Sequence, residues 1–225
     1  MVKIKVAILI DGGFYVKRAN HLFGEKTAQG RADELAYYCK LHLKSKHEDQ
    51  ELYRIFYYDC PPINGNVFHP YTKKNINYGK SELCVWMNDF LDELKTKRKF
   101  AIRLGRLSKP KFVLKPDKMK AIFENTITFD DIAEDDFVLS VTQKGVDMKI
   151  GVDIASIVFK KQAEQIILIS GDSDFVPAAK LARREGIDFI LDPMISNINS
   201  DLSEHIDGIR SQCEKLMKKP KLPKI

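Results

Sequence analysis

Two aspartates two residues apart follow the most apolar run of the chain. The run QIILIS predicts a buried strand, and Asp172 and Asp174 come directly after it in the segment ISGDSDF. Asp11 follows a second apolar run, KVAILI, and Asp147 starts a predicted helix after TQKGV. Carboxylate oxygens are the groups that hard cations prefer, so these four residues are the first candidates for chemistry.

The elements around these residues predict a single α/β domain. Continuous apolar strands that alternate with helices are typical of a parallel sheet covered on both faces. The pattern gives strands at 5–10, 51–59, 100–107, 165–170 and 187–192, a short apolar run at 136–143, helices from about residue 14 and at 32–44, 80–96, 147–161 and 176–186, a loop at 63–80, and an irregular charged insertion at 108–135. No internal repeat or clear linker divides the chain.

A parallel sheet brings the carboxyl ends of its strands to one edge, where ligands bind in folds of this class. We therefore expect Asp11, Asp147, Asp172 and Asp174 to converge, although they are far apart in the sequence. Each aspartate alone is explained as a helix cap or a turn residue. Together they would repel one another and raise one another's pKa unless a cation neutralised them. The grouping predicts a site for Mg²⁺ or Mn²⁺.

Asp153 lies on the same predicted helix as Asp147, about 120° away around the helix axis. Its neighbours on that side are apolar, and a carboxylate in such a setting needs a partner. Two interpretations stay open. Asp153 belongs to the active site, which we favour, or it pairs with a lysine such as Lys149 or Lys17.

Basic residues lie in a different part of the sequence. The formal net charge is +6 and the isoelectric point is about 9.0. Residues 95–120 contain eleven Lys or Arg and one acid, interleaved with aromatic residues, which favours contact with a polyanion. The alternative is a solvated loop that the acidic residues 124–136 neutralise. Within the segment we expect Arg103, Arg106 and Lys109 to contact a substrate.

The remaining composition predicts a cytoplasmic protein. Four cysteines are spaced too far apart for a CxxC metal knuckle and are expected to be free thiols. The apolar run at the N-terminus is too short for a signal peptide, and no stretch reaches the length of a membrane span. No membrane partner is therefore expected, and a homodimer is left open.

The motifs resemble those of the NYN-domain family, which belongs to the PIN-like ribonuclease superfamily and includes the LabA-like proteins. The resemblance spans about residues 4–192, with least support across 63–135. It rests on ILIDGG in the first strand, YYD at 57–59, KGVDMKIGVD at 144–153 and SGDSDFVPAAKLARREG at 170–186. The last two motifs are specific in both residue type and order.

The resemblance implies a three-layer PIN-like or Rossmannoid α/β domain, with a central, mainly parallel sheet flanked by helices. It implies a nuclease that uses Mg²⁺ or Mn²⁺ to activate water for attack on RNA phosphodiesters, with single-stranded RNA as the expected partner. Asp11, Asp147, Asp172 and Asp174 match the acidic, metal-holding cluster, and Asp153 matches a further catalytic acid. Ser170 and Lys144 are expected to orient the site and to meet substrate phosphate.

Residue 14 departs from the family pattern. The family often has Asn three residues after the first Asp, and this chain has Phe14. The main alternative is therefore an RNA-binding module with weak or no catalysis. An aspartyl-phosphate phosphatase is disfavoured because its DxD pair is missing around Asp11, and a dinucleotide fold because no GxGxxG follows a strand.

The expected domain organisation follows from these patterns. Residues 1–214 form the NYN-like domain, with the basic and acidic insertion at about 63–135 inside it. Residues 215–225 form a basic, lysine- and proline-rich tail.

Overall fold

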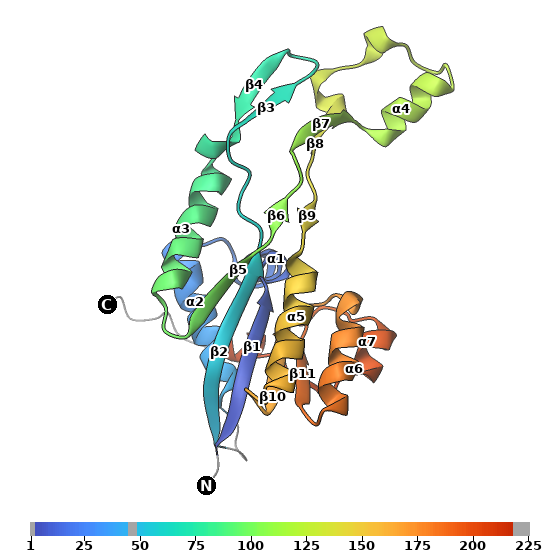
Figure 1. The fold of residues 1–225 in the computed structure, drawn as a ribbon. Coiled ribbons are helices and arrows are strands. Elements are labelled where there is room, and N and C mark those ends of the chain that lie inside the picture. Colours follow the sequence, from blue (N-terminus) through green and yellow to red (C-terminus); the bar gives the residue numbers. More distant parts are fainter. Residues whose placement is uncertain (1–2, 45–48, 218–225) are drawn as a thin grey trace.

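A parallel six-stranded sheet forms the centre of the molecule, with strand order β12–β11–β10–β1–β2–β5. The structure is a computed structural model that describes residues 3–44 and 49–217. Figure 1 shows the strands side by side with helices on both sides. The strands are β1 (Ile4–Asp11), β2 (Gln50–Asp59), β5 (Phe100–Leu104), β10 (Gln165–Ile169), β11 (Asp188–Asp192) and β12 (Gly208–Ile209).

Helices cover both faces of the sheet, which confirms the predicted three-layer α/β fold. Alternate residues of β1 enter different cores. Ile8 and Ile10 pack with the helices of one face, whereas Ala7 and Leu9 pack with those of the other. The first face carries α1 (Gly12–Phe23), α2 (Ala28–His42) and α3 (Glu82–Thr96); the second carries α5 (Val146–Phe159), α6 (Val176–Arg184) and the short α7 (Ser200–Glu204).

A long arm projects beyond the carboxyl ends of the strands (Figure 1). We call residues 64–80 and 105–144 the arm. It contains three antiparallel strand pairs, β3–β4, β6–β9 and β7–β8. Its elements are β3 (Asn66–His69), β4 (Lys74–Asn77), η1 (Tyr78–Lys80), β6 (Arg106–Leu107), β7 (Lys111–Leu114), α4 (Pro116–Phe123), η2 (Phe129–Asp131), η3 (Glu134–Asp136), β8 (Phe137–Ser140) and β9 (Gln143–Lys144).

The arm is where the sequence-based assignments were wrong. The predicted loop at 63–80 contains a β-hairpin, and the predicted irregular segment at 108–135 contains a strand and a helix. The predicted strand at 100–107 is divided at Gly105, whose N–H donates to the Asp59 carbonyl at 2.7 Å. A Cβ on Gly105 would lie 2.6 Å from the Lys144 carbonyl, so this close approach requires glycine.

Three further predictions concern the whole chain. All four cysteines are buried and free. None of the helices in the part of the chain that the structure describes is long and apolar enough to cross a lipid bilayer. The first three residues of the predicted basic tail, 215–217, belong to α8 (Cys213–Met217), and the rest of the tail, from 218 onward, lies outside the described residues.

A buried carboxylate, Asp192, joins the end of β11 to α2 and to the C-terminal segment. Its oxygens accept hydrogen bonds from the Tyr38 hydroxyl at 2.5 Å and the Ser211 hydroxyl at 2.6 Å. The backbone N–H of Met194 donates at 2.8 Å, and His42 Nε2 lies 2.8 Å away. Asp192 and His42 are almost completely buried, so water cannot replace these bonds.

Replacing Asp192 with Ala should lower the free energy of unfolding by about 3–5 kcal/mol, because several buried groups lose their partner at once. Urea unfolding followed by circular dichroism measures the change. The exposed Glu185→Ala should shift stability by no more than about 0.5 kcal/mol. A loss below about 1 kcal/mol in the Asp192 variant would show that this network is not a structural centre.

Candidate active site

The candidate site lies at the point where the order of strand addition to the sheet reverses. The chain moves from β1 to β2 and β5 on one side, then crosses to β10 on the other side of β1. Such a switch point leaves a crevice at the carboxyl ends of the two central strands. Ile10 of β1 pairs with Ile169 of β10, so Asp11 and Ser170 follow at the same level of the sheet.

Ser170 connects two of the predicted acids. Its hydroxyl donates to Asp11 Oδ2 at 3.3 Å and accepts the backbone N–H of Asp172 at 3.3 Å. Asp172 Oδ1 in turn accepts the backbone N–H of Asp174 at 3.0 Å, which starts the turn η4 (Ser173–Phe175). Ser170 is fully buried, a placement that suits orienting the carboxylates and leaves little surface for contact with a substrate.

Asp11 is both the last residue of β1 and the cap of α1. Its Oδ1 accepts the backbone N–H of Phe14 at 3.1 Å. The helix begins at once because Gly12 allows close packing: a Cβ there would lie 2.5 Å from the Tyr57 ring and 2.6 Å from the Tyr58 carbonyl. The Asp11 carboxylate is thereby fixed from two sides, by the helix N-terminus and by Ser170.

Charges link the acids into one group. Burial raises the pKa of Asp11 to about 6, and the charges of Asp147 and Asp59 add to this effect, while the Phe14 N–H opposes it. Burial also raises the pKa of Asp147, with further contributions from Asp172 and Asp174. The structure therefore brings the four predicted aspartates near one another, with Asp147, Asp172 and Asp174 exposed.

Asp59 is a member of this group that the sequence analysis missed. It ends β2 next to the end of β1, and it is 4% exposed. The Tyr57 hydroxyl donates to its Oδ2 at 2.9 Å, and the Cys60 N–H donates to its Oδ1 at 2.7 Å. Burial raises its pKa, against the effect of these two bonds. The rule that predicted Asp11, an acid at the end of a buried strand, also applies to Asp59.

Asp153 has partners outside this group. Its Oδ2 accepts the Tyr58 hydroxyl at 2.8 Å and lies 3.3 Å from Arg103 Nε. Arg103 also lies over the Phe56 ring, 5.4 Å from its centroid. The partner of Asp153 is thus an arginine from β5, and neither Lys149 nor Lys17 plays that part. The pair lines a small cavity of about 290 Å³ on the α5 face of the sheet.

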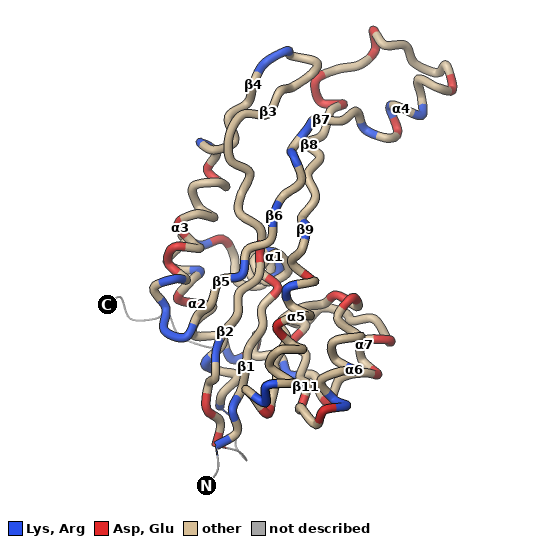
Figure 2. Tube along the Cα trace, viewed as in Figure 1, with Lys and Arg blue, Asp and Glu red and all other residues tan. Residues whose placement is uncertain are grey.

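The other predicted basic residues lie on the part of the arm that joins the body of the molecule. Arg106 of β6 pairs with Lys144 of β9 across an antiparallel ladder, and both are exposed. Lys144 is three residues before Asp147, and Lys109 follows β6 and is exposed. Figure 2 shows Lys and Arg along β6, β9 and the β7–β8 pair, above the acidic end of the sheet.

Phe14 packs against the loop that carries the paired aspartates. A Cβ on Gly171 would lie 2.8 Å from one ring carbon of Phe14 and 3.5 Å from the Ser196 hydroxyl. The aromatic ring therefore occupies the space between the start of α1 and the segment that follows β10. The apolar ring of Phe14 thus occupies the position at which the family resemblance predicts the amide side chain of Asn.

Comparison with known proteins decides the family. The sequence profile of the NYN domain matches residues 65–206, more than half of the chain. This protein belongs to the NYN domain family. NYN domains are a family of PIN-like nucleases, so the resemblance read from the motifs is confirmed.

The matched NYN region contains Asp147, Asp153, Asp172 and Asp174. The match begins after Asp11 and Asp59. The evidence that places these two residues with the other acids is therefore their position in the fold and not the profile match. The match also includes most of the arm, the segment in which the motif-based resemblance had least support.

Two further comparisons add little about function. No curated protein matched the sequence. A crystal structure of a protein of unknown function from Vibrio parahaemolyticus is similar at 15% sequence identity, with a TM-score of 0.49 and 93% of each chain covered.

The donor chemistry of this NYN site fits a divalent cation, whereas its geometry is not arranged in advance for one. Five carboxylates supply hard oxygen donors. Burial raises the pKa of Asp11 and of Asp147, neighbouring carboxylate charges add to this effect, and a bound cation would lower both pKa values again. Within residues 3–44 and 49–217, however, no three His, Cys, Asp or Glu side chains are grouped so that they could hold a metal ion.

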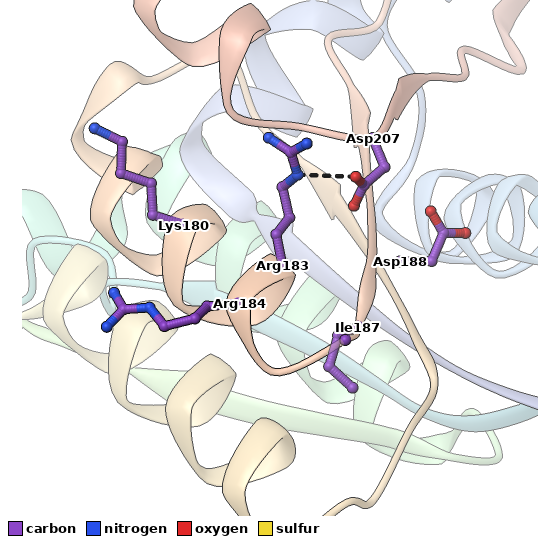
Figure 3. A pocket seen from close by; sticks show the side chains of 7 residues that line it. Lys180, Arg183, Arg184, Ile187, Asp188 and Asp207 are labelled. Atoms are coloured by element: carbon purple, nitrogen blue, oxygen red, sulfur yellow. Dashed lines mark hydrogen bonds and ion pairs between the residues drawn. The ribbon is translucent and has the colours of Figure 1, made fainter.

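A larger cavity, of about 840 Å³, lies far from these acids, at the amino-terminal edge of the sheet. Figure 3 shows Lys180, Arg183 and Arg184 of α6 around it, with Arg183 paired to Asp207 at 2.8 Å. Asp188, the first residue of β11, closes the other side (Figure 3). None of the site residues predicted from the sequence lines it.

The raised pKa of Asp11 predicts how stability depends on pH. In metal-free protein, the folded state holds its proton up to about pH 6, whereas the unfolded chain releases it near 3.8. The contribution of Asp11 to the free energy of unfolding is therefore fully present below pH 3.8 and is lost as the pH rises through 6. Asp11→Asn stays neutral and keeps a capping side chain, so above pH 7 it should be more stable than wild type by about 1–2 kcal/mol.

Urea unfolding in EDTA between pH 4 and pH 8 measures this difference. The gap between Asp11→Asn and wild type should open between pH 4 and 6 and then stay constant. Asp89→Asn, an exposed change on α3, should follow wild type at every pH. A gap that is independent of pH would mean that the Asp11 carboxyl titrates normally in the folded protein.

Proposed function

We propose that this NYN domain hydrolyses RNA phosphodiester bonds in a reaction that depends on a divalent metal ion, Mg²⁺ or Mn²⁺, and on its aspartates. The observation that carries the proposal is the convergence of Asp11, Asp147, Asp172 and Asp174 at the switch point of the sheet. Membership of a PIN-like nuclease family supports the same reaction class.

The four aspartates are the residues that would hold the cation. When bound, it would supply positive charge to the phosphate oxygens and favour attack by water. The chain itself supplies orientation. Ser170 fixes Asp11 relative to Asp172, and the N-terminus of α1 fixes Asp11 from the other side.

The basic residues at the arm root would bind the substrate. Lys144 and Arg106 are opposite each other on neighbouring strands, one short segment from Asp147. Cations in that position would hold the phosphates that flank the cleaved bond. The exposed Lys109 extends this surface away from the acids, along the arm.

Cleavage should require both the metal and Asp172. Wild type with a labelled single-stranded RNA and Mn²⁺ should give products that EDTA abolishes. Asp172→Asn should reduce the rate by at least 100-fold, since a metal ligand is lost without a change of volume. Asp89→Asn should cleave like wild type.

A second readout separates metal binding from turnover. Mn²⁺ should raise the melting temperature of wild type and of Asp89→Asn, and should have much less effect on Asp172→Asn. If Asp172→Asn cuts RNA as fast as wild type, the assignment of the aspartates is wrong.

Phe14 favours a second candidate function, an RNA-binding module with little catalysis. Its ring occupies the space beside Gly171, next to the loop that carries Asp172. An apolar ring there would hinder ordered water or a cation near the acids. This alternative predicts salt-sensitive RNA binding by wild type without cleavage, and cleavage that appears or increases in Phe14→Asn.

RNA binding should depend on the arm root and should not depend on the cavity at the opposite edge. Arg106→Ala with Lys109→Ala removes two phosphate contacts. The logarithm of the RNA association constant falls linearly with the logarithm of salt concentration, and this negative slope should become shallower by about 1.4 for a single-stranded RNA. Lys180→Ala with Arg184→Ala removes the same charge from α6 (Figure 3) and should leave the slope unchanged. Fluorescence anisotropy from 50 to 300 mM salt measures both. Equal losses in the two double variants would indicate binding through net charge alone.

A further inference from the structure

A cavity of about 540 Å³ lies where the arm joins the body of the molecule. We call it the arm-root cavity. Gly13 and Lys17 of α1 line one side, Met87 of α3 lines another, and Leu139 of the arm faces them. Asp59 and the residues that follow it, 60–63, also line the cavity.

The arm-root cavity is next to the candidate active site. Asp59 belongs to both, because it lines the cavity and its charge raises the pKa of Asp11. Gly13 also borders both. A Cβ on Gly13 would lie 3.7 Å from Asp11 Oδ1 and 4.0 Å from Gln143 Oε1, and Gln143 lines the cavity. A group that occupied the cavity would therefore be adjacent to one bound at the aspartates.

The walls of the cavity are mostly apolar, with a few polar groups. The apolar side chains come from the body and from the arm: Val16, Ile63, Met87, Leu107, Leu139 and Val141. The half-buried Tyr78 adds an aromatic side chain. Apolar walls with a few polar groups that fix orientation are typical of small-molecule binding sites.

The polar groups define which ligand would fit. Each carboxylate oxygen of Asp59 already accepts one bond, from Tyr57 or from Cys60. Each oxygen retains a second acceptor position, so Asp59 would bind a ligand that carries N–H donors. The exposed Lys17 lies on the same cavity and would favour an anionic group at its mouth.

We propose that the arm-root cavity binds a nucleobase of the RNA, beside the bond at the aspartates, and that Asp59 selects bases with an exocyclic amino group over uracil. The ring would pack on the apolar walls, the amino group of adenine, cytosine or guanine would donate to Asp59, and Lys17 would meet the adjoining phosphate. Uracil presents carbonyl oxygens on both sides of its only N–H, and these oxygens repel a carboxylate. This inference rests on the proposed function, since it assumes that the substrate is RNA.

Equilibrium binding in EDTA tests the inference without cleavage. The probes are fluorescent octamers of adenylate, cytidylate and uridylate. Wild type should bind the first two at least fivefold more tightly than the uridylate octamer. Met87→Trp and Leu139→Trp each fill the cavity from a different wall, and both should reduce this preference to less than twofold while binding the uridylate octamer normally.

Asp59→Asn provides a test of the hydrogen bond alone. Its amide offers one donor and one acceptor in nearly the same volume, so affinity for the uridylate octamer should rise relative to the cytidylate octamer. Circular dichroism melts establish that each variant is folded. Two filling variants are used so that failure of one to fold still leaves the test intact.

The outcomes separate the two proposals. If wild type binds the octamers without preference, or if both folded Trp variants keep the preference, the base-binding inference is overturned while the nuclease proposal stands. If wild type binds none of the octamers at any salt concentration, the proposed function and the inference both fail. Loss of preference with retained uridylate binding supports the inference.

Discussion

The candidate site depends on the parallel pairing of β1 with β10. These strands are adjacent in the sheet although more than 150 residues separate them, and their register places Ile10 beside Ile169. Side chains alternate between the two faces of the sheet, so the same register sends the side chains of β1 alternately into two different cores. A slip by one residue would exchange the cores and would also separate Asp11 from Ser170. Stability and the geometry of the acids are thus set by one interaction.

The acids at this edge are held at a cost to stability. Asp11 and Asp59 are both withdrawn from water, which raises the pKa of each carboxyl, and the charges of Asp147 and Asp59 further oppose the ionisation of Asp11. No requirement of folding explains such a group, because apolar or neutral residues at these positions would pack without electrostatic strain. Carboxylates with raised pKa values are frequent at functional sites, where residues needed for activity often lower the stability of the fold. The hydrogen bonds from Tyr57, Cys60 and Phe14 reduce the cost without removing it.

Sequence patterns predicted the part of the site that follows from topology. Acids placed at the ends of buried strands must meet when the sheet is parallel, which is why Asp11 and Asp172 could be found. Asp59 obeys the same rule, but its segment YYD served only as a motif of the family resemblance and was not included among the candidate acids. The partner of Asp153 could not be predicted, since Arg103 reaches it only through the position of β5 beside β2 under α5. The arm was missed for a related reason. In the sequence, α4 and the segment after it separate β7 from β8, and a local sequence pattern cannot predict pairing between strands so far apart.

The long separation between β1 and β10 also orders events during synthesis. Ser170 and Asp11 are 159 residues apart in the chain, so their hydrogen bond can form only after the segment between them and Ser170 itself have left the ribosome. Contacts of such high sequence separation form slowly, because a large loop must close first. Until then, Asp11 is present without the loop that carries Asp172. A nascent chain therefore contains its whole basic arm, which ends at residue 144, before the loop that carries Asp172 has been made and the acidic group can assemble.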